Sequence, residues 1–328
     1  MKSDVRLSIV TSLYRTSKYL DEFYRRTVAA ASALTDAFEV ILVNDGSPDD
    51  SMARALRLHE QDSRVRIIDL SRNFGHHKAL MTGLAHARGH LVFLIDSDLE
   101  EAPEWLLPFH DALLRSDVDV VYGVQRTRKG GWLERTTGAI FFRVISPLLT
   151  HRIPANVVTA RLMSRRYVQA LVQHRDRELC LSGVWVATGF EQQALGVDKG
   201  TRGETSYSMR RRISEFVSAV TSFSNRPLIF VFYLGTVVMI GSLVAAVGLI
   251  IQTLNHGIGV PGYASLMVSI WFLGGLMIFS IGIVGVYVAK VFTEVKDRPY
   301  TVIRAEYGGA ESHDNPTNPR TGSTVLRG

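Results

Sequence analysis

Two carboxylates stand one residue apart directly after an apolar run. The run, Leu91–Ile95, is too short to cross a membrane and has the composition of a strand that is buried on both faces. In an extended chain residues i and i+2 point to the same side, so Asp96 and Asp98 can converge on one point. Carboxylates that close repel each other unless a proton or a cation lies between them. Mg²⁺ or Mn²⁺ fits this need, because such an ion binds one or two carboxylates together with phosphate oxygens and water.

The same Asp-Ser-Asp segment has a plainer interpretation, in which a polar turn only caps the next helix. The surrounding elements favour a site. Up to about residue 123 short apolar runs alternate with longer amphipathic ones, which predicts an α/β fold with a mainly parallel sheet between helices. Ligands of such sheets bind beyond the carboxyl ends of the strands, where the pair stands. The predicted strands are 7–11, 38–43, 65–69, 91–95, 118–123 and 157–163, and the predicted helices are 20–34, 48–61 (with Ser47 as N-cap), 77–87 and one that begins at Pro103.

Composition and motifs exclude several classes of protein. No P-loop glycine pattern occurs, and no G-x-G-x-x-G pattern of a dinucleotide-binding fold follows a predicted strand. The single cysteine, Cys180, excludes an internal disulfide framework and a cysteine-based zinc site. A net charge of +6 on 328 residues is modest and does not indicate a nucleic-acid partner.

A long uncharged region separates this part of the chain from its C-terminal end. Between Arg226 and Lys290 there is no Asp, Glu, Lys or Arg. Its two apolar halves, 228–254 and 264–288, are each longer than the roughly 20 residues that cross a bilayer. Cations flank the pair of stretches but are absent from the connector, so the positive-inside rule predicts a multi-pass protein of the cytoplasmic (inner) membrane with both termini in the cytoplasm. The alternative is a buried helical hairpin in a large soluble protein.

These observations divide the chain into four parts and indicate two kinds of substrate. A cytoplasmic metal–phosphate site next to a membrane hairpin, with arginines clustered between them, suits a soluble nucleotide diphosphate compound and a lipid that carries an anion. The predicted parts are a catalytic domain over 1–207, a juxtamembrane amphipathic helix over 208–227, two transmembrane helices within 228–289, and a cytoplasmic tail over 290–328 whose end is disordered.

Seven motifs, over about residues 5 to 305, stand in the order seen in family 2 glycosyltransferases. The chain resembles more narrowly the polyprenyl-phosphate type, which includes dolichol-phosphate mannose synthase and bacterial undecaprenyl-phosphate sugar transferases. The resemblance implies a GT-A fold and inverting transfer of one sugar from a nucleotide diphosphate sugar, with uridine favoured as base, to a polyprenyl phosphate. It also implies a homotetramer. The motifs are Ser8–Thr11 with Tyr14, Val43–Asp49, Arg72–Gly75, Asp96–Leu99, Arg161–Met163, Arg202–Tyr207 and Glu294–Tyr300.

The resemblance also implies a role for each matching residue. Asp96, Ser97 and Asp98 match the D-x-D motif, in which the acids hold the divalent ion against the donor diphosphate. The nucleoside pocket is assigned to Ser12, Tyr14, Asp45 and Arg72. Arg126 and Arg135 correspond to residues that hold the acceptor phosphate, and Arg202 to an arginine that meets the phosphates as the site closes.

Four positions depart from the family pattern. Ser12 begins a segment that is usually Pro-x-Tyr-Asn-Glu, Asn44 replaces the first Asp of an Asp-Asp-Gly-Ser turn, and Glu100 replaces a Gln. Thr159 stands where many bacterial relatives carry an Asp that could act as a base. A polyprenyl phosphate has a second pKa near 6, so at neutral pH it is mostly dianionic and needs positioning more than proton removal.

Two other functions are compatible with parts of this pattern. A processive polysaccharide synthase of the same superfamily predicts a Gln-x-x-Arg-Trp segment and more spans, and neither is present. A non-catalytic membrane scaffold that keeps the fold is the second alternative, and the departures at Ser12, Asn44 and Thr159 suit it. Binding of a uridine or guanosine diphosphate that depends on Mn²⁺ distinguishes the enzyme from the scaffold.

Overall fold

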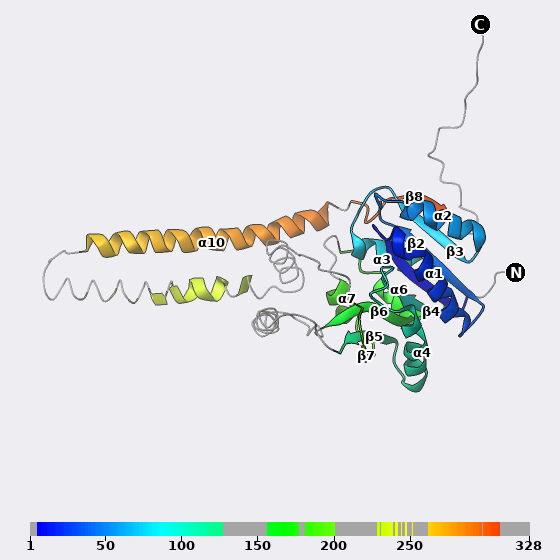
Figure 1. Cartoon of the computed structure of the whole chain (residues 1–328). Coiled ribbons are helices and arrows are strands. Elements are labelled where there is room, and N and C mark those ends of the chain that lie inside the picture. The colour runs from blue at the N-terminus through cyan, green and yellow to red at the C-terminus, as the bar shows by residue number, and fades with distance from the viewer. Residues whose placement is uncertain are drawn as a thin grey trace, which may run out of the picture. The chain divides into compact units, whose positions relative to one another are not determined.

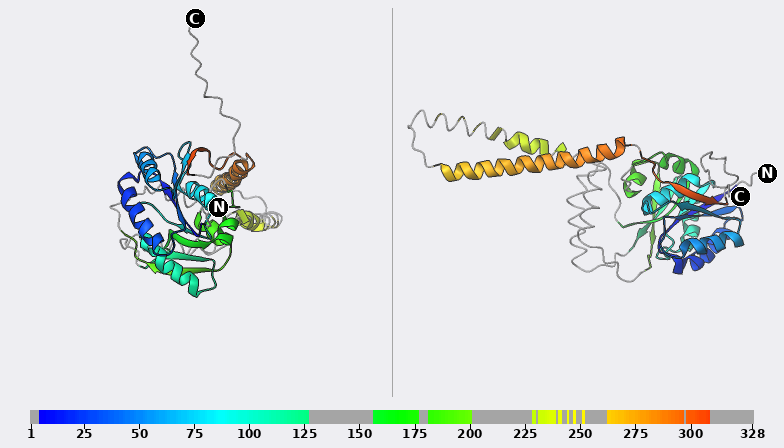
Figure 2. Two further views of the ribbon diagram at one scale, coloured as in Figure 1. Left: turned by 90° about the vertical axis from the view of Figure 1, so that its right-hand side faces the viewer. Right: turned by 90° about the horizontal axis from the view of Figure 1, so that it is seen from above.

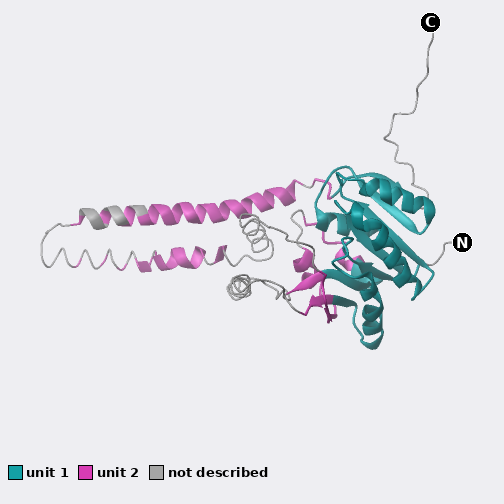
Figure 3. Cartoon of the chain, viewed as in Figure 1, with its two compact units in different colours: residues 1–122, 159–168, 301–328 teal, residues 123–158, 169–300 magenta. Residues whose placement is uncertain are grey.

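The structure is a computed structural model that describes residues 5–126, 156–176, 181–200, 262–296 and 298–308, and parts of 228–251. The chain divides into two compact units (Figure 3). Unit 1 comprises residues 1–122, 159–168 and 301–328, and unit 2 comprises residues 123–158 and 169–300. Several predictions lie outside the described residues: the roles of Arg135 and Arg202, the helix over 208–227, Cys180 and the end of the tail.

One sheet of eight strands forms the centre of the fold (Figure 1). The strand order is β7-β5-β6-β4-β1-β2-β3-β8, in which β4, β1, β2 and β3 run parallel and β6 and β8 pair antiparallel with β4 and β3. This confirms the α/β fold with a mostly parallel sheet. The bounds are β1 Leu7–Leu13, β2 Phe38–Asn44, β3 Val65–Leu70, β4 Leu91–Leu94, β5 Val120–Gln125, β6 Val157–Ser164, β7 Gln192–Val197 and β8 Ile303–Tyr307.

The central strands are buried along their whole length. Every residue of β1, β2 and β3 is buried, which is the pattern of parallel strands that are covered on both faces. The crossover connections place α3 on the opposite face from α1 and α2 (Figure 2). The helices of unit 1 are α1 Ser17–Ser32, α2 Ser51–Gln61, α3 His76–His86, η1 Pro103–Trp105, α4 Leu106–Arg115 and the first part of α6 Arg165–Leu171; unit 2 contains α7 Leu181–Ala187 and α10 Tyr263–Val295.

Packing on both faces follows from side chains of complementary size. Gly83 of α3 has no side chain, so the helix comes close to Val10 of β1 and Val43 of β2. On β4, Phe93 meets Phe109 of α4 edge to face, with ring centroids 6.2 Å apart. Such an edge-to-face pair contributes roughly 0.5–1.5 kcal/mol beyond the area that it buries. The parallel pairing of β1 with β4, up to Val10 opposite Leu94, places the carboxyl ends of these two strands next to each other.

The expected start of α2 is wrong by three residues. The sequence predicts Ser47 as N-cap and Pro48 as the first helical residue, but the helix begins at Ser51. The Ser47 hydroxyl instead donates to Asp49 and accepts the backbone N–H of Arg15. Asp49 also accepts the backbone N–H groups of Ser17 and of Ser51, the first residue of α2, so the turn holds the β1–α1 loop as well as the start of the helix.

Part of the predicted tail belongs to the sheet of unit 1. Strand β8 pairs with β3, with Ile67 opposite Tyr307 and Asp69 opposite Ala305. Arg304 lies 3.6 Å from Asp69, and it donates to the carbonyl oxygen of Ser71 at 2.6 Å. The region 290–328 is therefore not only a tail, because residues 303–307 cover the edge of β3.

In unit 2, α10 is one continuous helix (Figure 1). Its segment Phe272–Val295 is long and apolar enough to cross a membrane by length and composition, and it is the only such helix among the described residues. Large apolar side chains along it, including Ile278 and Phe292, are exposed. For the other predicted span, residues 231–238 are helical.

Candidate active site

The predicted site residues of β1 and β4 lie at a switch point of the sheet. The chain places β1, β2 and β3 side by side in one direction and then puts β4 on the other side of β1. Ligands of open α/β sheets bind beyond the strand ends at such a point. Ser12 lies in β1 and Ser97 follows β4, and the Ser97 hydroxyl donates to the carbonyl oxygen of Ser12 at 2.8 Å. The two strand ends are therefore joined directly.

Asp96 and Asp98 occupy a turn rather than an extended strand. Strand β4 ends at Leu94, and Leu99 has a φ of +63° in the left-handed region. The Asp98 carboxylate accepts the backbone N–H of Glu100 at 3.1 Å. The alternative that this segment caps the next helix is wrong, because the N-cap of η1 is Ala102 and no side chain caps that helix. Both carboxylates are half-buried, and both lie beyond the last paired residue of β4.

His76 is a site residue that the sequence did not predict. Its Nδ1 lies 2.8 Å from the Ser12 hydroxyl and its Nε2 lies 3.3 Å from Oδ1 of Asp96. Burial disfavours the charged ring, but the hydrogen bond and charge of Asp96, with the charges of Asp45 and Asp98, outweigh burial and raise the pKa of His76. One feature of the sequence could have predicted this role for His76. The residue begins α3 and directly follows the motif Arg72–Gly75. His76 connects the predicted nucleoside pocket with the predicted metal-binding carboxylate.

Asp45 holds the loop that precedes His76. Its two oxygens accept the backbone N–H groups of Phe74 and Gly75 at 2.7 and 3.0 Å. The side chain is buried, and burial raises the pKa of Asp45 although both N–H bonds act in the opposite direction. Both carboxylate oxygens accept from this loop, so Asp45 holds the loop in place before α3.

The other predicted pocket residues differ in how firmly they are held. Tyr14 is 43% exposed, and the guanidinium of Arg15 lies 5.6 Å from its ring centroid. The Arg72 guanidinium lies 4.1 Å from the ring centroid of Phe74 and donates to the carbonyl oxygen of Asn73. An aromatic ring and a stacked arginine can both contact a planar base.

Thr159, on the neighbouring strand β6, and Glu101, which lies between β4 and η1, both support Asp96. The Thr159 hydroxyl donates to Oδ2 of Asp96 at 2.9 Å. Glu101 is fully buried, and its carboxylate accepts the backbone N–H of Thr159 at 2.8 Å and that of Asp96 at 3.4 Å. Thr159 stands in the place of an Asp that could act as a base, and its hydroxyl contacts the first carboxylate of the D-x-D motif.

In unit 2, Arg126 is the one predicted acceptor-binding arginine that lies within the described residues. Its backbone N–H donates to the carbonyl oxygen of Val197, and its guanidinium lies 3.8 Å from the Asp198 carboxylate. Its side chain lies over Gly196, where an added Cβ would be only 2.8 Å from Nε of the arginine. The guanidinium is 65% exposed, so its charge is accessible to an anion.

The donor set of the Asp-Ser-Asp turn fits a hard divalent cation. Among the described residues no group of three or more His, Cys, Asp and Glu side chains could hold a metal by itself. Two half-buried carboxylates suit Mg²⁺ or Mn²⁺ in particular, because these ions keep several water or phosphate ligands when they bind a protein. Asp96 and Asp98 would hold such an ion.

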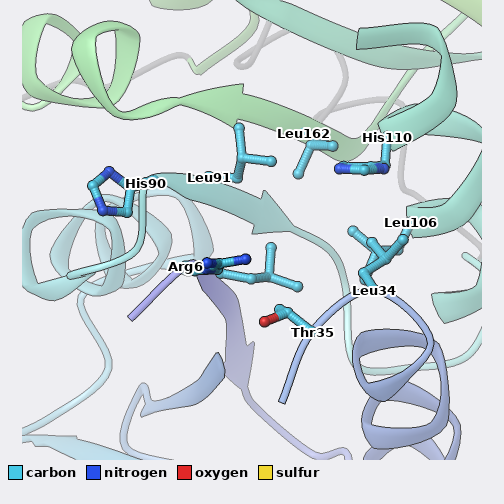
Figure 4. A pocket seen from close by; sticks show the side chains of 9 residues that line it. Arg6, Leu34, Thr35, His90, Leu91, Leu106, His110 and Leu162 are labelled. Atoms are coloured by element: carbon cyan, nitrogen blue, oxygen red, sulfur yellow. The ribbon is translucent and has the colours of Figure 1, made fainter. Parts of the chain in front are cut away.

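A cavity of about 510 Å³ in unit 1 lies at the amino-terminal ends of β1 and β4, whereas the switch point is at their carboxyl ends. Figure 4 shows the side chains that line this cavity. Leu7 and Leu91, the first residues of β1 and β4, line it together with Arg6, His90 and His110. None of the residues that line it was predicted as a site residue. It is therefore separate from the switch point.

Known proteins resemble the chain over nearly its full length. Residues 8–172 match Glycosyl transferase family 2. A Mycobacterium tuberculosis protein described as a glycosyltransferase is 50% identical, over 97% of this chain and 93% of its own. The SfII prophage-derived bactoprenol glucosyl transferase of Shigella flexneri is 30% identical, over 93% and 99% of the two chains. A solved structure, glucosyl-3-phosphoglycerate synthase from Mycobacterium tuberculosis with Mn²⁺, UDP and phosphoglyceric acid, is 18% identical with a TM-score of 0.45, covering 66% of this chain and 78% of that one. The chain is a glycosyltransferase and belongs to glycosyl transferase family 2.

Proposed function

We propose that this enzyme transfers one sugar, with inversion, from a nucleotide diphosphate sugar to a polyprenyl phosphate at the cytoplasmic face of the membrane. The observation that carries the proposal is the chain of contacts at the switch point, in which His76 lies between Ser12 and Asp96. This arrangement supports a nucleoside pocket at Ser12 next to a carboxylate that would bind the cation of the donor diphosphate. A uridine diphosphate sugar is the favoured donor. The similarity to a bactoprenol glucosyl transferase over almost the full chain supports a lipid phosphate as acceptor.

The reaction needs charge neutralisation more than proton transfer. An oxygen of the acceptor phosphate attacks the anomeric carbon, the bond from that carbon to the donor phosphate oxygen breaks, and the electron pair leaves with the nucleoside diphosphate. The acceptor is mostly dianionic at neutral pH, because its second pKa is near 6. Bound Mg²⁺ or Mn²⁺ would neutralise charge on the departing diphosphate. Asp96 and Asp98 would hold this cation, and Thr159 does not act as a base.

The remaining site residues bind and orient the two substrates. Ser12, Tyr14 and Arg72 line the nucleoside pocket, and Asp45 shapes its wall through the loop before α3. The acceptor phosphate is held by Arg126, Arg135 and Arg202. Arginine suits this role because its planar fork of N–H donors matches two phosphate oxygens at once.

The membrane topology follows from charge placement. The segments 228–254 and 264–288 form a hairpin of two spans with both termini in the cytoplasm, and α10 contains the second. The protein is a homo-oligomer, for which the resemblance to the polyprenyl-phosphate type suggests a tetramer. A bilayer next to the catalytic unit supplies the lipid acceptor.

The test is transfer from labelled donors in membranes that contain the full chain. A panel of uridine and guanosine diphosphate sugars is offered with undecaprenyl phosphate, and the lipid product is identified by mass. Asp98→Ala is expected to lower the transfer rate by about 100-fold or more, because charge stabilisation by a bound cation contributes several kcal/mol. Asp111→Ala, which removes an exposed carboxylate on α4, is the matched control and keeps the wild-type rate. Unchanged product formation by Asp98→Ala would refute the metal role.

A further inference from the structure

The position of Thr159 follows from the pairing of β4 with β6. In this antiparallel pair Leu91 is opposite Ser164, Phe93 is opposite Leu162 and Leu94 is opposite Arg161. The same register, continued by two residues, places Thr159 opposite Asp96. Directly opposed side chains on one face of an antiparallel pair lie about 4.5–5.5 Å apart at Cβ, which is within reach of a hydrogen bond between a hydroxyl and a carboxylate. The observed bond between Thr159 Oγ1 and Asp96 Oδ2 has this geometry and is 2.9 Å long.

Glu101 holds the two backbones together where the strand pairing stops. The last paired residues are Leu94 and Arg161, so Asp96 and Thr159 lie beyond the ladder. Each of their backbone N–H groups donates to one oxygen of the Glu101 carboxylate. A side chain therefore supplies the acceptors that a strand would otherwise provide, and it keeps the opposed pair in register.

A buried arginine balances the charge of this carboxylate. Glu101 has no exposed surface and Arg161 is 1% exposed. Burial lowers the pKa of Arg161, while the neighbouring Tyr167 and the charge of Glu101 act in the opposite direction. A carboxylate without a partner would be costly at this depth. The charges of Arg161 and Glu101 attract each other, and the two carboxylate oxygens of Glu101 accept the two backbone N–H groups.

We propose that Thr159, held by Glu101, is a positioning residue that sets the orientation of the Asp96 carboxylate for a divalent cation. The inference rests on the proposed function, because it concerns the same cation site. The hydroxyl donates to one oxygen of Asp96 and leaves lone pairs on both oxygens for a cation. Side chains that orient a metal ligand in this way typically change metal affinity by 10–100-fold when they are removed.

Two substitutions of Thr159 separate the hydroxyl from the rest of the side chain. Thr159→Val keeps the shape and the backbone N–H that donates to Glu101, whereas Thr159→Ser keeps the hydroxyl. The measurement is the dissociation constant of Mn²⁺ in the presence of UDP, from electron paramagnetic resonance of free Mn²⁺ with the purified full chain. Thr159→Val is expected to weaken Mn²⁺ binding by at least about tenfold, and Thr159→Ser to restore it to within about threefold. Wild-type affinity in Thr159→Val would overturn the proposal.

Glu101→Gln tests the support behind Thr159. A glutamine offers only one acceptor oxygen, so one of the two N–H groups loses its partner. Mn²⁺ binding is expected to weaken, and amide hydrogen exchange is expected to accelerate at Asp96 or Thr159 while the central strands stay protected. Glu104→Gln is the matched control, since its carboxylate pairs with Arg26 at the surface and lies outside this network. Unchanged exchange in Glu101→Gln would contradict the assigned support.

The outcomes distinguish this inference from the proposed function. If wild-type membranes make no lipid-linked sugar from any donor, the proposed function fails, while the Mn²⁺ comparison between Thr159→Val and Thr159→Ser still decides the positioning role. If Thr159→Val loses transfer but binds Mn²⁺ as the wild type does, Thr159 acts on a substrate and the positioning role is wrong.

Discussion

Gly46 is the position where one methyl group should damage both folding and donor binding. It follows Asp45 at the end of β2 and has a φ of +59°, in the left-handed region. A Cβ at this position would lie 2.6 Å from the backbone nitrogen of Asn73 and 2.7 Å from the carbonyl carbon of Arg72. Non-bonded atoms normally stay about 3.5 Å apart or more, so the loop with Arg72 would have to move by close to 1 Å.

Two costs add in the substitution Gly46→Ala. The left-handed conformation costs about 1–2 kcal/mol for a residue with a Cβ. Steric overlap in a packed region costs about 1–3 kcal/mol more, and backbone atoms yield less easily than the end of a side chain. We therefore expect a loss of roughly 2–5 kcal/mol in the free energy of unfolding. A displacement of 1 Å in a substrate-positioning loop can lower a rate by about 100-fold, so transfer should fall with stability.

Gly189→Ala is the control that isolates the steric part. Gly189 has a φ of +76°, and no atom lies within 4 Å of an added Cβ. This variant should lose only the conformational cost of about 1–2 kcal/mol. The assays are urea denaturation of the full chain in detergent and calorimetric titration with UDP in the presence of Mn²⁺. Equal losses of stability in the two variants, with UDP affinity unchanged in Gly46→Ala, would refute the close approach of these loops.

Three further predictions concern the stability of unit 1. Burial opposes ionisation of Asp62, but hydrogen bonds from Arg64 and from a tyrosine on α1 lower its pKa to about 2, below the ordinary 3.8. The ionised group therefore stabilises the fold above about pH 4, and this contribution is lost as the pH falls toward 2. After a discount for solvent screening, Asp62→Asn should lower the free energy of unfolding by about 1 kcal/mol at pH 7 and by almost nothing at pH 2. Urea denaturation at both pH values measures this difference. An equal loss at both pH values would contradict the role assigned to Asp62. Glu39→Gln breaks a buried ion pair with Arg66 (2.8 Å) and should lower the free energy of unfolding by about 3 kcal/mol, whereas a loss below about 1 kcal/mol would show that the pair is not buried as described. Gly83→Ala places a Cβ 2.5 Å from a valine methyl group of β1. The melting temperature should therefore fall, although alanine has a higher helix propensity than glycine. A rise in the melting temperature would show that α3 does not pack this closely on the sheet.

Local pattern was enough to predict most elements of the sheet and the residues at its carboxyl edge. Buried parallel strands are continuous apolar runs, so their positions can be read within a residue or two, and β4 at 91–94 was expected at 91–95. Strand β8 was missed because its alternating half-buried residues become a strand only when β3 provides a partner. The start of α2 was misplaced because Asp49 bonds to a loop more than 30 residues away.

The amino-acid sequence by itself determined the family, the acidic pair Asp96 and Asp98, and the apolar helix that could cross a membrane, because these depend on residue type, spacing and length. Only the tertiary structure decided how the pair is held. Thr159 is 63 residues from Asp96, and His76 reaches Asp96 from another element. Glu101 is not singled out by any sequence pattern, yet the fold buries it and uses its two oxygens as acceptors for two separate segments. Such contacts join groups that are distant along the chain, so no local pattern encodes them, and they form only when the strands have packed.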